Sequence, residues 1–409
     1  MTAQVVVVGA GVAGLAAAWA ARRAGREVTV VSRGPGASAL GGGAVDDVPW
    51  EQLQRAARLL DDATHARPLA PEVAAFVAEL GLWDVPASRR VWLATVAGRL
   101  RPARGRDRAA LDLGALGGAV VLVPRADRAG WDADAVAAAL RADPHARAQR
   151  ITFRAVDAAV LRFDEEHRIG DGDLAARHDD EIRIRWLAER LRSALVVSPQ
   201  AGAILLGPWL GAAAPRAEAL SRSLGLPVGE ALVGAGSPAG MRFEAARDRM
   251  LDAIGARRVR DRVTRVSPGE GKLAVMLEAD EAPLVADVAV LAVGGLVGGG
   301  LIYAPPERGA GADLAPGGKV PFELSLRAPV VLSLGGPRRM EIVASMHGPD
   351  LDVTAWPTDG RPGVLESVGV RCEGTRAEER IHAAGDVVAG RARTLLEAVA
   401  AGIAAGGAT

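Results

Sequence analysis

Cysteine is almost absent from this chain of 409 residues, which contains Cys372 alone. A single thiol excludes an intrachain disulfide, and it cannot hold an iron–sulfur cluster, which usually takes about four cysteine ligands. Any such cluster must therefore be carried by a partner. Aromatic side chains are also scarce, at 3% of the residues, so we expect a core built mainly from alanine, valine and leucine.

An excess of one charge is missing as well. The 49 basic and 49 acidic side chains give a formal net charge of zero. This balance argues against nucleic acid or an anionic membrane surface as the main partner, because both attract basic proteins. With 49% hydrophobic residues, a chain of this length can bury a large core and form two domains.

No apolar stretch is long enough to predict a membrane span. The strongest candidate, residues 195–214, is interrupted by Pro199, Gln200 and Pro208, and is better explained as a buried strand with flanking turns. The first residues lack the basic region of a signal peptide and already belong to a predicted strand. We therefore expect a cytoplasmic protein without a direct membrane span.

Residues 1–33 carry the clearest pattern in the chain. Gln4–Val8 is a run of β-branched residues, followed by a glycine turn at 9–14, an alanine-rich segment at 15–24 and a second β-branched run at 27–31. Strand, glycine turn, helix and strand in this order form the βαβ unit that binds dinucleotides. The turn has the sequence GAGVAG, which matches the G-x-G-x-x-G fingerprint.

Each glycine of this turn has a mechanical role. Gly9 allows the tight turn, Gly11 lets backbone amides approach a pyrophosphate, and Gly14 lets the helix lie close to the strand. The helix N-terminus then presents N–H groups and a partial positive charge to the phosphates. The alternative is a βα turn with a purely structural role, but the flanking strands and helix favour the dinucleotide site.

The ribose-binding acid of such sites is missing. It should follow roughly 20 residues after the glycines, where this chain has Ser32 and Arg33. Glu27 comes too early, at the start of the second strand. Since an arginine at this place can accept a 2′-phosphate, an NADP-binding protein stays open as an alternative.

A glycine-rich loop follows the second strand. It contains Ser38, Gly41, Gly42 and Gly43. Glycine leaves room for the backbone to approach a flat ligand, and the loop emerges at the carboxyl edge of the sheet, where such folds bind ligands. The alternative is a flexible surface connection.

Two later stretches complete the expected site. The strand at 288–293 runs into Gly294, and a short strand ends at Gly385 and Asp386 before a helix at 393–405. The Asp386 carboxylate could accept a hydrogen bond from a ribityl hydroxyl. The helix N-terminus could stabilise charge on a flavin pyrimidine ring.

These motifs resemble FAD-dependent oxidoreductases of the succinate dehydrogenase and fumarate reductase clan. The shared features are GAGVAG at 9–14, the strand ending at 292–294 and AAGD at 383–386. Within that clan the chain most resembles the B subunit of the anaerobic glycerol-3-phosphate dehydrogenase. Three further stretches carry this likeness: residues 32–34 with 38–46, Val120–Pro124 with the helix after it, and 290–300.

The resemblance implies an α/β fold, in which a discontinuous Rossmann-like FAD-binding domain carries an inserted α/β cap domain. It also implies two partners: a catalytic flavoprotein like the family's A subunit, and an iron–sulfur protein like its C subunit, which passes electrons to quinone. The complex would oxidise glycerol 3-phosphate, or a related small hydroxy substrate, and the partners could hold the chain at the inner face of the membrane. The family's flavin is commonly FMN, but G-x-G-x-x-G suits the ADP half of FAD. We expect FAD, with FMN as the alternative.

We expect the FAD-binding domain at residues 1–88, 236–300 and 361–409. The cap is expected at 89–235, with a continuation at 301–360. The predicted site is built from backbone and small side chains, and no metal ligand is predicted. The predicted cofactor-binding residues are Gly9, Ala10, Gly11, Val12, Ala13, Gly14, Ser32, Arg33, Ser38, Gly41, Gly42, Gly43, Ala292, Val293, Gly294, Gly385, Asp386, Thr394 and Leu395.

No catalytic residue is assigned from the sequence. Oxidation of a hydroxyl on a phosphorylated substrate needs a base for the proton and cations for the phosphate. The candidates are His347, Arg338 and Arg339, each better explained as a turn residue, and the less plausible His178. Trp356 could stack on a ligand, although packing is the better explanation.

Three classes of function stay open. The chain could be a flavoprotein subunit of a dehydrogenase complex, a stand-alone FAD-dependent oxidoreductase acting on another small substrate, or an NADP-binding protein. A variant of the first class is a scaffold or electron-relay subunit whose flavin never meets the substrate.

Overall fold

The protein is described from a computed structural model, and its chain divides into two compact units. The first unit joins Met1–Ala37 to Arg249–Thr409, and the second is the continuous segment Ser38–Asp248. The described residues are 2–48, 66–234, 236–269, 271–280, 282–295, 300, 302–304, 325–327, 331–332, 370, 372–388, 391 and 393–409.

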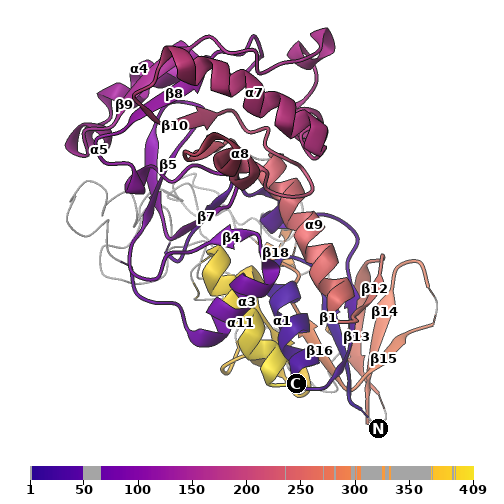
Figure 1. Cartoon of the computed structure of the whole chain (residues 1–409). Coiled ribbons are helices and arrows are strands. Elements are labelled where there is room, and N and C mark those ends of the chain that lie inside the picture. Colours follow the sequence, from indigo (N-terminus) through magenta and orange to yellow (C-terminus); the bar gives the residue numbers. More distant parts are fainter. Residues whose placement is uncertain are drawn as a thin grey trace, which may run out of the picture. The chain divides into compact units, whose positions relative to one another are not determined.

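A six-stranded sheet forms the centre of the first unit, in the order β12-β2-β1-β16-β21-β20 (Figure 1). All neighbours from β12 to β21 are parallel, and only β20 runs antiparallel. Val5 to Val8 of β1 are all buried, as expected for a central strand covered on both faces. The strands are Gln4–Val8 (β1), Glu27–Val31 (β2), Arg257–Val259 (β12), Val288–Leu291 (β16), Arg376–Glu378 (β20) and Ile381–Ala383 (β21).

Helices α1 (Val12–Arg23) and α11 (Leu395–Gly407) lie side by side in this unit (Figure 1). Their backbones touch, because a Cβ on Gly402 would lie 2.3 Å from the Ala13 oxygen and one on Gly406 would lie 2.1 Å from the Ala17 oxygen. These two glycines are about one helical turn apart and share a face of α11. The small residues of the last helix therefore have a packing role.

A second sheet of the first unit has the order β15-β14-β13-β19. The pattern of residues 258–266 predicts a single strand from the sequence alone, but the structure divides this stretch between two strands, β12 and β13. The chain pairs with β2 as β12, leaves that sheet at Arg260, and enters the antiparallel sheet as β13. The remaining strands are Val263–Pro268 (β13), Leu273–Leu277 (β14), Leu284–Ala286 (β15), Val331–Leu332 (β19), Ile302–Ala304 (β17) and Ser325–Arg327 (β18).

The second unit is built on a four-stranded parallel sheet, β11-β10-β8-β9. Its core combines Val, Leu and Ile with a few large aromatic residues, among them Phe153 and Trp209. The sheet strands are Val120–Pro124 (β8), Thr152–Val156 (β9), Ala201–Leu206 (β10) and Val228–Glu230 (β11). The helices are Pro71–Leu80 (α3), Ala133–Ala142 (α4), Pro144–Ala148 (α5), Asp171–Arg177 (α6), Glu181–Val197 (α7) and Ala217–Leu224 (α8).

Two smaller sheets complete the second unit, with the orders β3-β7-β4 and β5-β6. Helix α9 (Pro238–Ala253) carries the chain from the second unit back into the first. The strands are Ala44–Val45 (β3), Trp83–Asp84 (β4), Val91–Ala94 (β5), Leu100–Ala103 (β6) and Gly105–Asp107 (β7).

A buried ionic triad ties α9 to the second unit. Arg242 is 1% exposed, and its guanidinium donates to both oxygens of Asp107 at 3.1 and 3.0 Å and to Glu230 at 2.8 Å. Burial raises the pKa of Glu230, whereas the two carboxylates raise that of Arg242 against the effect of burial. Each member has an opposite charge in contact, which buried charges require.

The predicted fold class, a mixed α/β chain with a discontinuous Rossmann-like unit and an inserted α/β unit, is confirmed. The unit boundaries differ from the predicted ones at 88 and 235. Residues from Ser38 onward pair inside the second unit, because β3 joins β7 and a Cβ on Gly42 would lie 2.1 Å from the Val233 oxygen. In the expected cap continuation, 301–360, the described strand β19 pairs with β13 of the first unit.

No helix within the described residues is long and apolar enough to cross a membrane.

Candidate dinucleotide site

The glycine turn after β1 requires its glycines. Gly9 has φ +106°, its amide donates to the Val31 oxygen at 2.8 Å, and a Cβ would lie 2.2 Å from the Ala292 oxygen. A Cβ on Gly14 would lie 1.9 Å from the Gly9 oxygen and 3.3 Å from the Ala292 Cβ. Any side chain at either position would push apart β1, α1 and the segment after β16.

The turn delivers the positive end of α1 to the carboxyl edge of the sheet. Gly11 is the N-cap and has no side chain to accept a helix amide, and no acid lies in the first turn. The basic residues Arg22 and Arg23 lie in the last turn instead. No acid of α1 itself therefore offsets the positive end of the helix dipole, which favours an anion at this edge.

Two other chain segments meet the glycine turn. Gly294 follows β16 with φ +82°, and Gly385 follows β21 with φ +73°. A Cβ on Gly385 would lie 2.7 Å from the Ala13 Cβ, and the Ala384 amide donates to Leu291 at 2.9 Å. The carboxyl ends of β1, β16 and β21 thus converge, and they bring together Gly9, Ala10, Gly11, Val12, Ala13, Gly14, Ala292, Val293, Gly294, Gly385 and Asp386.

Four of these residues have buried side chains. The side chains of Ala10, Val12, Ala13 and Ala292 are buried in the core, at 4 to 7% exposure. Their peptide groups, rather than their side chains, are therefore the parts of these residues most open to a ligand at the turn.

Asp386 is the acid at this convergence. Burial raises the pKa of its carboxyl, and the nearby Arg393 guanidinium lowers it to a smaller extent. A Cβ on Gly295 would lie 3.0 Å from the Asp386 Cβ, so glycine there leaves room for the carboxyl. A half-buried carboxyl of this kind can hold a hydroxyl group by a strong hydrogen bond.

Thr394 and Leu395 begin helix α11. Thr394 is the N-cap, and its hydroxyl oxygen accepts the Glu397 amide at 3.3 Å. Glu397 also pairs with Arg391 at 3.1 Å. The T-x-x-E spacing at 394–397 is a capping-box pattern that the sequence already contained. Contact of Thr394 and Leu395 with a cofactor stays a prediction.

Ser32 and Arg33 follow β2 at the same edge. The Ser32 amide donates to the Val259 oxygen of β12 at 3.0 Å, and the Arg33 guanidinium pairs with Glu278. Sequence reasoning missed Glu278, because 245 positions separate the two partners and no local motif marks the acid.

Ser38, Gly41, Gly42 and Gly43 belong to the second unit. There Gly41 accepts the Ser237 hydroxyl at 2.9 Å, and Gly43 has φ +104° beside Leu232. Close contact with the Val233 backbone explains the glycine at 42, and the positive φ explains the glycine at 43. Their contact with a ligand stays a prediction.

Three residues weighed for catalysis, His347, Arg338 and Arg339, lie outside the described residues, as does Trp356, which was weighed for stacking on a ligand. His178 belongs to the second unit and is 1% exposed. Its burial, together with the charge of Arg183, lowers its pKa to about 4. His178 is therefore a neutral, enclosed imidazole, although the charged residues around it in the sequence predict a solvated loop.

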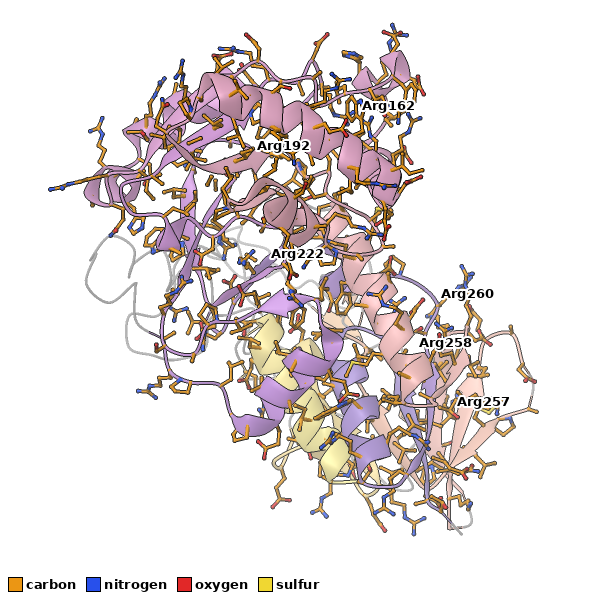
Figure 2. The ribbon with its side chains drawn as sticks, in the orientation of Figure 1. Arg162, Arg192, Arg222, Arg257, Arg258 and Arg260 are labelled. Carbon is orange, nitrogen blue, oxygen red and sulfur yellow. The ribbon has the colours of Figure 1, made fainter. Side chains whose placement is uncertain are left out.

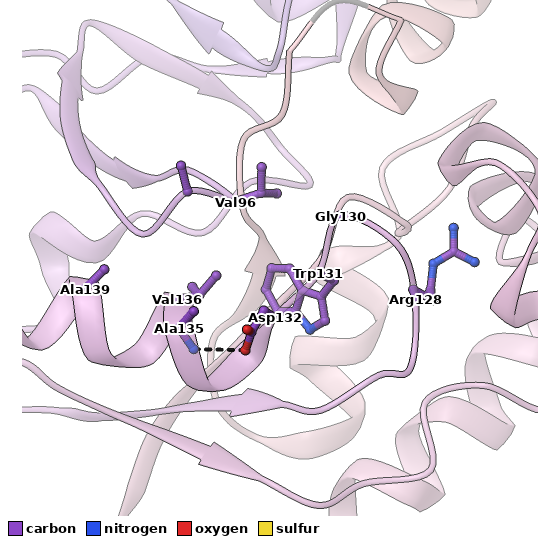
Figure 3. Close-up of a pocket in the computed structure, with 9 residues that line it drawn as sticks. Val96, Arg128, Gly130, Trp131, Asp132, Ala135, Val136 and Ala139 are labelled. Carbon is purple, nitrogen blue, oxygen red and sulfur yellow. Dashed lines mark hydrogen bonds between the residues drawn. The ribbon is translucent and has the colours of Figure 1, made fainter.

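The second unit also contains a pocket of about 370 Å³ beside α4 (Figure 3). Its lining is mainly apolar, and its polar side chains are engaged elsewhere. Asp132 accepts the Ala135 amide at 3.0 Å, Trp131 donates to Pro124 at 2.9 Å, and Arg128 pairs with Asp171 at 2.8 Å. The lining residues are Val96, Ala97, Arg128, Gly130, Trp131, Asp132, Ala135, Val136 and Ala139.

Within the described part of the chain, no group of three or more His, Cys, Asp or Glu residues is arranged to hold a metal ion.

A family model for NAD(P)-binding Rossmann-like domains matches residues 7–80. The match covers the glycine turn, α1 and β2, so it agrees with the geometry of the first unit. No curated protein matches the sequence.

Three solved structures have low similarity to the chain. CtdE in complex with FAD is 10% identical, with 76% of this chain and 44% of that chain covered and a TM-score of 0.27. Putrescine oxidase bound to putrescine is 16% identical, with 72% of this chain and 58% of that chain covered and a TM-score of 0.24. The peptidyl tryptophan dihydroxylase QhpG is 13% identical, with 73% of this chain and 33% of that chain covered and a TM-score of 0.24. The chain spans less than two thirds of the length of each. At such TM-scores none of the three carries a functional assignment.

Proposed function

We propose that the protein is a flavin-dependent oxidoreductase whose first unit binds FAD. The observation that carries this proposal is the convergence of three strand ends on the N-terminus of α1, with Asp386 beside it. A dinucleotide needs close backbone approach at its phosphates and a polar group further along. The described residues supply both.

The contacts around the glycines show whether the residues present fit FAD. A Cβ at Gly9, Gly14 or Gly385 would clash with backbone or Cβ atoms at 1.9 to 2.7 Å, so the three segments are in direct contact where the phosphates would approach. The α1 N-terminus would stabilise the pyrophosphate. Asp386 would accept a ribityl hydroxyl, which is present in FAD and FMN but not in NADP. FMN lacks the second phosphate and the adenosine, so the G-x-G-x-x-G turn favours FAD.

When bound, the flavin supplies the redox chemistry itself. The residues of this chain would bind and orient it. Gly9 and Gly14 hold the backbone at the phosphates, and Asp386 fixes the polyol. The α1–α11 contact keeps the loop after β21 in place, since Gly385 packs against Ala13.

The finer proposal is a subunit of a glycerol-3-phosphate dehydrogenase complex, or of a complex acting on a related small hydroxy substrate. Its support is the resemblance carried by residues 32–34, 38–46 and 290–300. With Cys372 alone, the iron–sulfur cluster needed to reach quinone would belong to the iron–sulfur partner, and the first oxidation to the catalytic flavoprotein partner.

The visible spectrum of the purified protein tests the flavin. We expect the visible absorption bands of a bound flavin and release of FAD on denaturation. The Gly11→Leu variant should lose the flavin, whereas Gly407→Leu, at a position with nothing within 4 Å of an added Cβ, should retain it. A colourless wild type would contradict the proposal, and released FMN would replace FAD with FMN.

Oxidation of glycerol 3-phosphate with a dye as electron acceptor tests the finer proposal. An obligate subunit should be inactive alone and active with its two partners. Activity of the isolated chain would identify a stand-alone oxidoreductase. Co-purification of NADP without flavin would favour the third class, which the Arg33 side chain and the NAD(P)-binding family match support.

A further inference from the structure

We infer that Glu278, from the end of β14, replaces the missing ribose-binding acid of the dinucleotide site. The inference rests on the proposed function and names the residue that would recognise the adenosine ribose. In Rossmann-like sites this acid stands at the end of the second strand. Here that position holds Ser32 and Arg33, and Glu278 is the carboxylate in contact with it.

Backbone hydrogen bonds place Glu278 at the correct edge. The Gly9 amide donates to Val31, the last residue of β2, at 2.8 Å, so the glycine turn adjoins this strand end. The next residue, Ser32, donates its amide to Val259 of β12 at 3.0 Å. The Glu278 amide donates to the Arg262 oxygen at 2.9 Å, which ties the end of β14 to the segment that follows β12.

The loop after Arg33 returns to the same turn. A Cβ on Gly36 would lie 3.8 Å from the Gly11 Cα, so residues 33–36 border the phosphate-binding glycines. Arg33 is thus placed between the glycine turn and Glu278. In dinucleotide sites the adenosine ribose lies on this side of the pyrophosphate, next to the second strand.

Asp261 is the other acid at this edge, and its carboxylate is engaged by backbone. One oxygen accepts the Arg262 amide at 2.7 Å, and the other accepts the Ala279 amide at 3.2 Å. It holds together the strand ends of β13 and β14. Glu278 instead has two arginine partners, Arg33 and Arg262, the second at 3.5 Å.

Those ion pairs leave Glu278 available to a ligand. The side chains of Arg33 and Glu278 are 64% and 41% exposed, and exposed pairs contribute little, about 0–1 kcal/mol. Two ribose hydroxyls can therefore compete for the carboxylate at small cost. Arg33 would orient the acid. The exposed arginines Arg258, in β12, and Arg260, just after it, would attract the anionic dinucleotide (Figure 2).

The same geometry argues against a 2′-phosphate at this position. A phosphate placed against Arg33 would also approach the Glu278 carboxylate, and like charges in contact repel. Glu278 thus favours an unphosphorylated ribose, as in FAD, over the phosphorylated ribose of NADP.

The test measures binding of ADP, the half of FAD that carries this ribose, to the full chain stripped of flavin. Glu278→Gln should weaken ADP binding by roughly tenfold or more, the effect of a hydrogen bond to a charged group. It should not weaken binding of 2′,3′-dideoxy-ADP, which has no hydroxyls to donate. The control is Glu373→Gln, an exposed acid paired with Arg376 beside β20 at the opposite edge of the sheet.

Three results would overturn the inference: an unchanged ADP affinity in Glu278→Gln, an equal loss for ADP and its dideoxy analogue, or tighter wild-type binding of adenosine 2′,5′-bisphosphate than of ADP. A flavin-coloured wild type with any of these results would leave the proposed function intact. A colourless wild type would instead contradict the proposed function itself.

Discussion

Burial gives Asp386 and Glu278 different chemistry, although both are carboxylic acids of the first unit. Asp386 is half-buried, and burial raises its pKa, so it can be protonated at a higher pH than an exposed aspartate. Glu278 is solvent-exposed and paired with arginine. The first suits one defined hydrogen bond to a polyol, whereas the second suits reversible contact with hydroxyls at the surface.

Asp386→Asn should weaken binding of both FAD and FMN by roughly tenfold to a hundredfold, because the amide cannot form a charge-assisted hydrogen bond to a ribityl hydroxyl. Equilibrium titration with each flavin measures this, with the exposed Glu379→Gln as the control. A loss confined to FAD would contradict the role, since both flavins carry the ribityl chain.

His178 should make the second unit acid-sensitive. Its pKa is lowered to about 4, mainly by burial, against 6.5 when unfolded. Between these values the unfolded chain binds the extra proton and the folded chain does not. The free energy of unfolding therefore falls as the pH drops from 6.5 to 4, by on the order of 3 kcal/mol in total.

Chemical denaturation at pH 7.5, 6, 5 and 4 would measure the slope of the free energy of unfolding against pH. His178→Leu should flatten it, whereas His167→Gln, which changes a partly exposed histidine of the same unit, should leave it in place. An identical slope in His178→Leu would show that other groups cause the acid sensitivity.

At the scale of elements, the contact of α1 with α11 decides the shape of the site. Gly402 and Gly406 of α11 let the backbones of the two helices touch, and Gly385 packs against Ala13 of α1. The loop that carries Asp386 is thereby positioned by helix packing as well as by β21.

Gly406→Leu should destabilise the first unit by about 1–3 kcal/mol or more, because a larger side chain must separate α11 from the Ala17 oxygen. Flavin affinity should fall with it, since Gly385 and Asp386 move with α11. Thermal unfolding and flavin titration measure both, with Gly407→Leu as the neighbouring control. Unchanged stability would mean that α11 does not pack this closely.

How well the sequence predicted each element depended on how local its signals are. The unit from Gln4 to Val31 was predictable because strand, glycine turn and helix are adjacent in the chain. The change of sheet at Arg260–Arg262 was not, since those residues contain neither glycine nor proline, the usual signals of a break between two strands. The pairing of Arg33 with Glu278 depends on that change of sheet, so it was hidden for the same reason.

At the scale of the whole molecule, the boundary of the second unit was the least predictable feature. The glycines after β2 suggested a ligand loop of the first unit. In the structure Gly42 packs against Val233, a partner almost at the other end of the inserted segment. Sequence spacing cannot distinguish a glycine that admits a ligand from one that admits a distant backbone.

Residues 38–248 should fold when expressed alone, because their strands pair with one another and Arg242 finds Asp107 and Glu230 within the segment. Circular dichroism and a cooperative thermal transition would show this. Arg242→Met should abolish or weaken the transition, since it leaves two buried carboxylates without a cation. The exposed Arg222→Met is the control. A fragment without a cooperative transition would mean that it depends on the first unit.

The packing of α1 on α11 also implies an order in which the two units fold during synthesis. As the chain leaves the ribosome, α1 is made early, but the helix it packs against begins only at Leu395. The uninterrupted segment 38–248 can bury its core long before that. The unit that starts first is thus completed last, and Asp386 arrives just ahead of the closing helix. Cofactor loading would then be a late step of biogenesis, coupled to the docking of α11.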